Sequence, residues 1–180
     1  MVFNELRLKD VWLIKLEPRV DDRGLFVRTY CEKEFVDHGL NIHWPQCNLT
    51  LTKQKGVIRG LHFQAEPHPE IKLVRCARGA IYDVVVDVRP DSQTYGKWLA
   101  VELSPARGEM LYIGAGLAHG FQVLEGDSEV SYQMSAIYVP ELARGIRWSD
   151  PAIGIEWPIA SPVLSERDQK LPLLSDLDGV

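Results

Sequence analysis

Short runs of β-branched and aromatic residues, each stopped by glycine, proline or serine, recur along this chain and leave little room for helices. Residues 80–88 are rich in valine and stop at Pro90, and residues 98–103 stop at Ser104-Pro105. Further runs of this kind cover residues 71–76, 110–113, 120–124 and 129–137, and the last two flank a hairpin connection at 125–128. Strands spaced this closely predict an antiparallel sandwich or barrel.

The two ends of the chain read differently from this β-rich middle. One helix is predicted over residues 31–38, ending at Gly39 as the residue after its last turn. From Pro140 onward the chain holds five of its 11 prolines, which predicts an irregular tail wrapped over the barrel. The extended N-terminal part is suited to cover a sheet edge by pairing with another subunit, which favours a dimer. No boundary or repeat interrupts residues 1–180, so we expect a single domain.

Charge and cysteine content exclude several classes of function. The chain has 20 basic and 25 acidic residues, a net charge of −5, which argues against nucleic-acid binding. An anionic small molecule stays possible, because a few inward-facing arginines make a positive pocket. Cys31, Cys47 and Cys76 form no CxxC pair, which is typical of thiols in a reducing cytosol. Without a signal-like start or a membrane-length apolar run, we expect a soluble cytoplasmic protein.

The segment Arg59-Gly60-Leu61-His62-Phe63-Gln64 carries the clearest chemical pattern. It places a histidine three residues after an arginine, and Lys72 follows ten residues later. A base, a fixed cation and an ammonium group suit proton abstraction next to a carbonyl, where the cations stabilise the enolate. Taken alone, the segment is better explained by a histidine satisfied inside a β-rich core.

Other common chemistries find little support in the sequence. No Walker A loop or GxSxG elbow occurs, and the segment from Gly114 to His119 lacks the third glycine of a dinucleotide fingerprint. A metal-dependent β-barrel enzyme is the main competitor, with available ligands at His62, His68, His119, Glu66, Glu70 and Glu109. No HxH or HxxxH pair sets two imidazoles on one strand face, so the sequence favours no metal.

Two further residues have an open interpretation at this point. Strand alternation places Tyr132 on one face with Val130 and Met134, where it is either core filler or a positioned phenol. Asp168 follows Ser165-Glu166-Arg167 in the tail, where a helix-capping or solvated acid is as good an interpretation as a functional one.

Over nearly its whole length the chain also resembles a known family. The shared motifs, in the family's order, are Asp22-Arg23-Gly24-Leu25-Phe26, Gln46-Cys47-Asn48, Arg59-Gly60-Leu61-His62-Phe63-Gln64, Lys72-Leu73-Val74-Arg75, Asp87-Val88-Arg89, Ala118-His119-Gly120-Phe121, Tyr132 with Tyr138, Gly154-Ile155-Glu156-Trp157-Pro158, and Leu164-Ser165 followed by Asp168. Together they make the chain similar to the dTDP-4-dehydrorhamnose 3,5-epimerases. This resemblance implies a mainly β, cupin-type jelly-roll barrel, a homodimer, and catalysis without a cofactor on a nucleotide-linked 4-keto-6-deoxy sugar.

The resemblance also implies roles for four catalytic residues. By similarity, His62 is the base that removes a proton next to the ketone, and Asp168 orients its imidazole. Tyr132 resembles the acid that returns a proton to the opposite face. Lys72, together with Arg59, is then expected to stabilise the enolate oxygen at C4.

The substrate-binding residues follow from the same resemblance. Arg23 and Arg167 suit the diphosphate, because guanidinium groups match phosphate oxygens in paired hydrogen bonds. The remaining expected contacts are His119 near the sugar and phosphate, Tyr138 stacked on thymine, Gln46 and Asn48 lining the pocket, and Arg28 at a family contact position.

The chain departs from the family pattern at four places. Arg28 and Ala143 stand where glutamates are frequent, Thr50 replaces a serine with one residue inserted before Arg59, and Gln133 replaces a lysine. None of these is a catalytic position, so they bear on the nucleotide and the sugar.

The sequence therefore predicts a double epimerase that serves deoxyhexose synthesis for a cell-surface polysaccharide or glycoside. The alternatives are a single-centre epimerase acting at C3 or C5 of another nucleotide sugar, a sugar-nucleotide-binding protein without catalysis, and a metal-dependent cupin enzyme. Neither the nucleotide nor the number of inverted centres follows from the residues.

Overall fold

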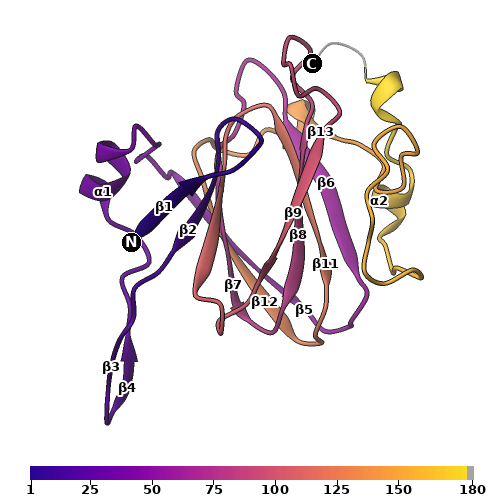
Figure 1. Cartoon of the computed structure of the whole chain (residues 1–180). Coiled ribbons are helices and arrows are strands. Elements are labelled where there is room, and N and C mark those ends of the chain that lie inside the picture. Colours follow the sequence, from indigo (N-terminus) through magenta and orange to yellow (C-terminus); the bar gives the residue numbers. More distant parts are fainter. Residues whose placement is uncertain (178–180) are drawn as a thin grey trace.

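Two antiparallel sheets face each other in the computed structural model, which describes residues 1–177 (Figure 1). One sheet has the strand order β1-β2-β10-β7-β12-β5 and the other the order β13-β6-β11-β8-β9. The strands are β1 (Val2–Glu5), β2 (Val11–Lys15), β5 (Gln46–Thr52), β6 (Ile58–Gln64), β7 (Lys72–Arg78), β8 (Ile81–Asp87), β9 (Trp98–Leu103), β10 (Glu109–Ile113), β11 (Leu117–Val123), β12 (Ser128–Met134) and β13 (Ala143–Gly145). The predicted mainly β jelly-roll barrel is confirmed.

The helices are few and short, as the sequence predicts. They are α1 (Glu32–Asp37), α2 (Glu166–Gln169), and the 3-10 turns η1 (Pro140–Leu142) and η2 (Leu174–Asp176). The predicted helix at 31–38 is α1, and Gly39 follows it with φ +68°, the left-handed conformation that glycine adopts without strain. Of the predicted domain 1–180, the last three residues lie outside the described part.

Two of the longer strands, β5 and β6, have no counterpart among the predicted strands. Gly60 interrupts the apolar pattern of β6. A glycine inside a strand also normally weakens that strand. Here β6 and β11 approach so closely that a Cβ at Gly60 would lie 2.5 Å from the Cα of Gly120. The glycine therefore permits close packing of the two strands, and the bulge in their register falls between His119 and Phe121.

Apolar residues from both sheets meet in a core between them. Strand β8 is buried on both of its faces, because Ile81 and Val85 point into this core whereas Val84 and Val86 point to the outside of the barrel. The core also contains Val74, Leu111, Phe121 and Val130 from four other strands.

The tail after Pro140 covers the outer face of the sheet that contains β8 (Figure 1). Ile146, Ile153 and Leu174 pack there against β6 and β8, so the predicted wrapping of the tail is confirmed. Within the tail, β13 adds an edge strand beside β6, and the chain then runs to α2. This course brings α2 into contact with β6.

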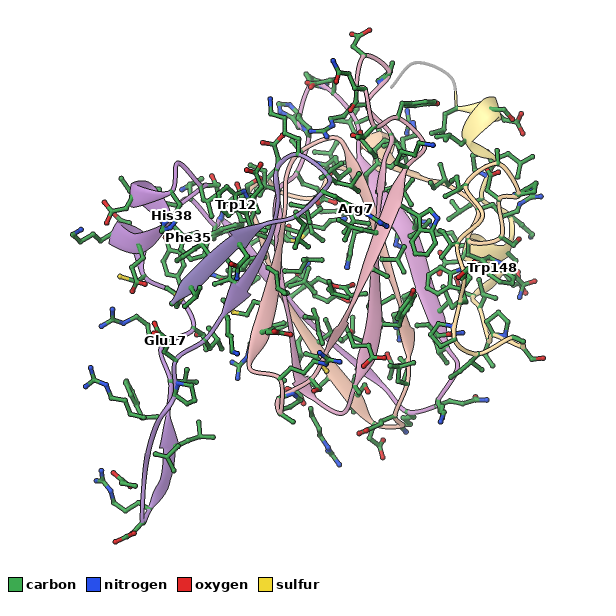
Figure 2. All side chains as sticks on the ribbon, in the orientation of Figure 1. Arg7, Trp12, Glu17, Phe35, His38 and Trp148 are labelled. Atoms are coloured by element: carbon green, nitrogen blue, oxygen red, sulfur yellow. The ribbon has the colours of Figure 1, made fainter. Side chains whose placement is uncertain are left out.

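The outer face of the other sheet is covered by the segment around α1. Phe35 of α1 is fully buried against that face, with Trp12 beside it on β2 (Figure 2). His38 at the end of α1 stacks on Phe3 with ring centroids 4.0 Å apart. Strand β1 pairs with β2, and β2 pairs with β10, so residues 2–15 extend the sheet of their own chain.

A two-stranded hairpin, β3 (Arg19–Asp21) and β4 (Gly24–Phe26), projects away from the barrel (Figure 1). Its apolar residues Val20, Leu25 and Phe26 are all exposed. Within residues 1–177, no helix is both long and apolar enough to cross a membrane.

Asp87, at the end of β8, connects two loops to the barrel through hydrogen bonds and ion pairs. Its fully buried carboxylate accepts hydrogen bonds from Arg89, Ser92 and Thr94, and Arg89 also pairs with Asp10 between β1 and β2. Burial acts to raise the pKa of Asp87, but these donors outweigh it and lower the pKa to about 2. The network thus favours the folded state whenever the carboxylate is charged.

Asp87→Asn should lower the free energy of unfolding at pH 7 by about 2.5 kcal/mol, since the charged carboxylate has a folded pKa about two units below its unfolded value. Because the folded pKa is depressed, this stabilisation is present above about pH 4 and is lost as the pH falls toward 2, with about half left at pH 3. Urea unfolding at pH 7 and pH 3 measures it. The exposed neighbour Asp91→Asn is the control, and an equal deficit at both pH values would contradict the prediction.

Candidate active site

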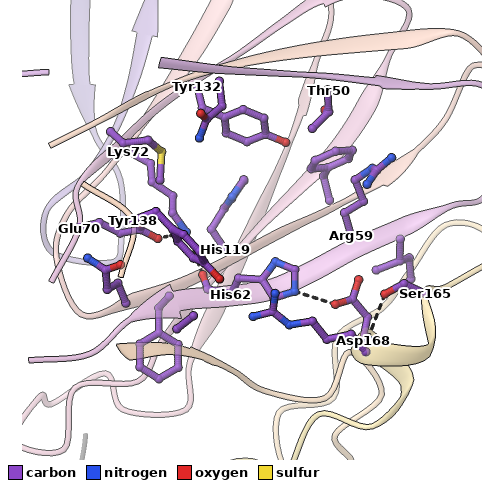
Figure 3. Close-up of a pocket in the computed structure, with 18 of the residues that line it drawn as sticks. Thr50, Arg59, His62, Glu70, Lys72, His119, Tyr132, Tyr138, Ser165 and Asp168 are labelled. Atoms are coloured by element: carbon purple, nitrogen blue, oxygen red, sulfur yellow. Dashed lines mark hydrogen bonds and ion pairs between the residues drawn. The ribbon is translucent and has the colours of Figure 1, made fainter. Parts of the chain in front are cut away.

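A cavity of about 860 Å³ opens between the inner faces of the two sheets (Figure 3). Side chains from β5, β6, β7, β11 and β12 line it, together with β13 and the segment that leads into α2. Ten of the residues predicted for the site lie on this cavity: Gln46, Asn48, Arg59, His62, Lys72, His119, Tyr132, Tyr138, Arg167 and Asp168. The barrel therefore gathers most of the predicted set in one place.

His62 and Asp168 form a hydrogen-bonded pair at the cavity wall (Figure 3). The Nε2 of His62, on β6, lies 2.7 Å from Oδ1 of Asp168, and the side chain of Asp168 is 7% exposed. Ser165 caps α2 by accepting a hydrogen bond from the backbone N–H of Asp168, which fixes where the carboxylate sits. The solvated interpretation of Asp168 is therefore wrong.

The pKa of Asp168 reflects two opposing effects. Burial acts to raise it, but the hydrogen bond and charge of His62, with the donors of Gly60 and Ser165, outweigh burial and lower the pKa below its ordinary value. The carboxylate is thus ionised at neutral pH and accepts the Nε2–H of His62. In the neutral imidazole, this leaves the lone pair on Nδ1 as a base.

Tyr132 occupies the facing sheet, on β12, and lines the same cavity as His62. It packs against the inter-sheet core, so it fills the core and presents a phenol at the same time. Burial raises the pKa of Tyr132 well above the ordinary value, and the nearby Thr50 hydroxyl and Arg59 charge only partly offset this. The phenol therefore stays protonated at neutral pH and can act as an acid.

Lys72 begins β7 and its ammonium is almost completely buried. Its Nζ donates to the backbone carbonyl of His62 at 2.9 Å and pairs with Oε1 of Glu70 at 2.9 Å (Figure 3). The ammonium is thus held beside β6, the strand that carries His62.

His119 lies on β11 directly across from His62, its Cα partner in the register of the two strands. Its Nε2 bonds Oδ1 of Asp83, and both side chains are buried. The imidazole also meets the ring of Tyr132 edge to face, with centroids 6.2 Å apart. A second imidazole–carboxylate pair therefore lies beside His62, with the imidazole of His119 on the cavity wall.

Among the predicted binding residues, Gln46 and Tyr138 are joined at the cavity rim, since Oε1 of Gln46 accepts the backbone N–H of Tyr138. Gln46 also donates to Asn48 at 3.3 Å. Arg59 donates through Nε to the Thr52 hydroxyl, which orients its guanidinium from the side of β5.

Arg23 and Arg28 are the two predicted site residues that do not reach this cavity within one chain. Arg23, at the turn of the β3–β4 hairpin, has a 90% exposed side chain and pairs with Asp21. Arg28 pairs with Glu34 of α1.

Some cavity residues were not predicted as site residues from the sequence. The sequence offers Glu70 only as a possible metal ligand, and it predicts no role for Arg144 on the cavity wall or for Asp83, which bonds His119. A sequence pattern was available for Glu70, which stands two residues before Lys72 and so on the same side of an extended chain. Asp83 is flanked by apolar residues in β8, and a charged residue inside such a strand indicates a buried polar pair.

The acidic chain nevertheless has a basic cavity. Arg59, Lys72, Arg144 and Arg167 lie on the wall against two carboxylates, Glu70 and Asp168. Such a surface suits an anionic small molecule, and its volume matches that of typical ligand pockets. Within residues 1–177, no group of three or more His, Cys, Asp or Glu side chains is arranged to hold a metal ion.

Comparison with known proteins agrees with the resemblance found in the sequence. A family model described as dTDP-4-dehydrorhamnose 3,5-epimerase matches residues 5–176. The chain belongs to this family. Among members of the epimerase family, a dTDP-4-dehydrorhamnose 3,5-epimerase of Sinorhizobium fredii (strain NBRC 101917 / NGR234) is 47% identical over 178 residues, which is 98% of this chain and 91% of the relative.

Two more epimerases mark the range of the similarity. A dTDP-4-dehydrorhamnose 3-epimerase of Streptomyces niveus is 37% identical over 98% of this chain and 85% of its own. The crystal structure of the dTDP-6-deoxy-D-glucose-3,5-epimerase of Legionella pneumophila, in complex with dTDP-4-keto-L-rhamnose, superposes with a TM-score of 0.93 at 33% identity, covering 98% of this chain and 94% of that one.

In this epimerase, Tyr132→Phe should leave the tyrosinate absorbance of the folded protein unchanged up to pH 10.5, because burial raises the pKa of that phenol. Absorbance at 295 nm during a pH titration measures the ionised phenols.

Unfolding provides the control for this titration. In guanidinium chloride all six tyrosines should titrate near pH 10, so the variant should lose one sixth of the absorbance there. Circular dichroism checks that the folded samples stay folded. The same loss in the folded protein would contradict the prediction.

Proposed function

We propose that this protein is an isomerase that converts dTDP-4-dehydro-6-deoxyglucose to dTDP-4-dehydrorhamnose by inverting C3 and C5. The observation that carries the proposal is the position of His62 and Tyr132, which lie on facing sheets and line one cavity. A base and an acid on opposite sides of a sugar ring are what inversion requires. The names of its relatives support the same substrate.

The proposed reaction begins with the removal of a carbon-bound proton. Nδ1 of His62 takes the proton from the carbon next to the C4 ketone, and the electron pair of the broken C–H bond moves to form the enolate. The negative charge of Asp168 stabilises the imidazolium that results, at 2.7 Å from its Nε2. Lys72, together with Arg59, stabilises the oxygen on which charge develops.

The second half of the reaction adds a proton from the other side. Tyr132 donates its phenolic proton to the same carbon, the enolate collapses to the ketone, and the configuration is inverted. The raised pKa of Tyr132 keeps that proton in place before the reaction. Solvent then restores the proton to the phenol and removes the one on His62.

The remaining cavity residues are assigned to the nucleotide portion of the substrate. Arg167 and His119 face the diphosphate and sugar, and the exposed ring of Tyr138 is placed to stack on the base. Gln46 and Asn48 offer amide groups at the rim for hydrogen bonds to the nucleotide.

We place Arg23 and Arg28 in a homodimer. The β3–β4 hairpin carries three exposed apolar residues, Val20, Leu25 and Phe26, which a second copy of the chain would cover. In that arrangement the hairpin of one copy reaches the cavity of the other, so that Arg23 meets the diphosphate and Arg28 lies near the nucleotide. The free thiols of Cys31, Cys47 and Cys76 support a cytoplasmic location.

A single-centre epimerase is the second candidate, because the relative from Streptomyces niveus is named a 3-epimerase. Ala143 belongs to the cavity wall, where a small apolar side chain replaces the glutamate frequent in the family. Both candidates use the same proton removal and proton return next to the ketone. They differ in how many ring carbons come within reach of His62.

In D₂O, the protein should introduce deuterium at C3 and C5 of dTDP-4-dehydro-6-deoxyglucose, and His62→Ala should lower both exchange rates by at least a hundredfold because the base is lost. Mass spectrometry and proton NMR measure the two positions. His68→Ala, an exposed histidine outside the cavity, is the control. Deuterium at one carbon alone would favour the single-centre candidate, and none at either would contradict the proposal.

Asp168→Asn should lower kcat by a factor of about 10² to 10⁴, since it removes the charge that stabilises the His62 imidazolium while keeping the shape of the side chain. Steady-state kinetics on the same substrate measure the effect. Glu166→Gln on the same helix, whose side chain is 93% exposed, should retain wild-type kcat. A kcat within twofold of wild type for Asp168→Asn would be inconsistent with the assigned role.

A further inference from the structure

The pair formed by Glu70 and Lys72 is a buried ion pair on the cavity wall (Figure 3). Their side chains are 10% and 7% exposed, and Nζ of Lys72 lies 2.9 Å from Oε1 of Glu70. Glu70 belongs to the loop between β6 and β7, whereas Lys72 is the first residue of β7. The loop thus delivers a carboxylate to an ammonium that the sheet holds in place.

Charge explains why a carboxylate is needed at this point. A buried ammonium without a partner is strongly unfavourable, and the other cations of the cavity wall are Arg59, Arg144 and Arg167. The second carboxylate of the wall, Asp168, is already bonded to His62. Glu70 is therefore the acid that compensates Lys72.

The geometry of the ammonium indicates what this compensation achieves. An ammonium has three N–H donors. In Lys72, one donates to the backbone carbonyl of His62 at 2.9 Å, and Oε1 of Glu70 forms an ion pair with Nζ at 2.9 Å. An N–H that does not face the His62 carbonyl is left for a substrate oxygen. The carbonyl and the carboxylate hold Nζ in one position beside β6, so that little reorganisation is needed when charge develops.

We propose, on the basis of the function proposed above, that Glu70 is a positioning residue that acts through Lys72. It holds the ammonium where an N–H meets the developing enolate oxygen, and it does not itself contact the substrate. The close contact between Nζ and Oε1 is the essential interaction, so a neutral oxygen held in the same place preserves much of the function.

Kinetics of two Glu70 variants test this role. Glu70→Ala removes the acceptor and should lower kcat at least tenfold while KM changes less than threefold, because the positioned donor serves the transition state. Glu70→Gln keeps an oxygen at the same place. Its kcat should be at least the geometric mean of the wild-type and Glu70→Ala values. Glu141→Ala, an exposed acid outside the cavity, is the matched control.

A double-mutant comparison tests whether Glu70 acts through Lys72. In the background of Lys72→Ala, the further change Glu70→Ala should cost less than twofold in the deuterium exchange rate, since the group that it positions is gone. An added tenfold loss would show that Glu70 acts on the substrate directly and would overturn the proposal. Wild-type kcat for Glu70→Ala, or a Glu70→Gln variant as slow as Glu70→Ala, would also overturn it.

A measurement without substrate separates this proposal from the proposed function. Proton–nitrogen NMR tuned to lysine ammonium groups should give a slowly exchanging Lys72 signal, assigned by its loss in Lys72→Ala. The signal should disappear in Glu70→Ala, whose circular dichroism should match wild type. A persistent signal would show that Glu70 does not hold the Lys72 ammonium, and it would overturn this proposal even in an active enzyme. If the Lys72 signal depends on Glu70 but no sugar exchanges deuterium, the proposed function is contradicted instead.

Discussion

The hydrogen bond between His62 and Asp168 is the interaction on which the site depends. It joins β6 to the short helix α2 near the end of the chain, across 106 residues. A helix of four residues has little stability of its own, so its position is set by the Ser165 cap and by the packing of the tail on β6 and β8. The apolar contacts of the tail thus determine whether His62 meets the carboxylate of Asp168.

The two-sheet architecture explains why Tyr132 and His62, the proposed acid and base, face each other. His62 and Tyr132 belong to different sheets, and side chains of successive residues alternate between the faces of a strand. A shift of one residue in either register would turn the group away from the cavity. The close contact at Gly60 and the antiparallel pairing of β12 with β7 and β5 hold these registers in place.

The net charge of the whole chain and the charge of the cavity wall have opposite signs. The chain as a whole is acidic, with a net charge of −5, whereas its cavity wall has more cations than carboxylates. Each of the two wall carboxylates is paired with a basic side chain, Asp168 with His62 and Glu70 with Lys72. The remaining guanidinium groups are therefore available to an anionic ligand.

Local patterns made much of the barrel predictable. The predicted runs became β7 to β10 and β12 to within a few residues, because β-branched and aromatic side chains favour extended backbone. Strands β5 and β6 were missed, since a mid-strand glycine and polar residues obscure their alternation. The proline-rich tail was predicted as a covering segment, but its contact with His62 was visible only through the family resemblance.

The sequence by itself determined which chemical groups are present and, in the strands that its patterns predict, on which face each one stands, because the period of two is a local property of extended chain. Only the tertiary structure decided which of these groups meet. Asp168 reaches His62, Glu70 reaches Lys72 and Asp83 reaches His119, whereas Arg23 and Arg28 lie away from the cavity of their own chain. Contacts between distant segments depend on the packing of every strand between them, and no local pattern encodes that packing.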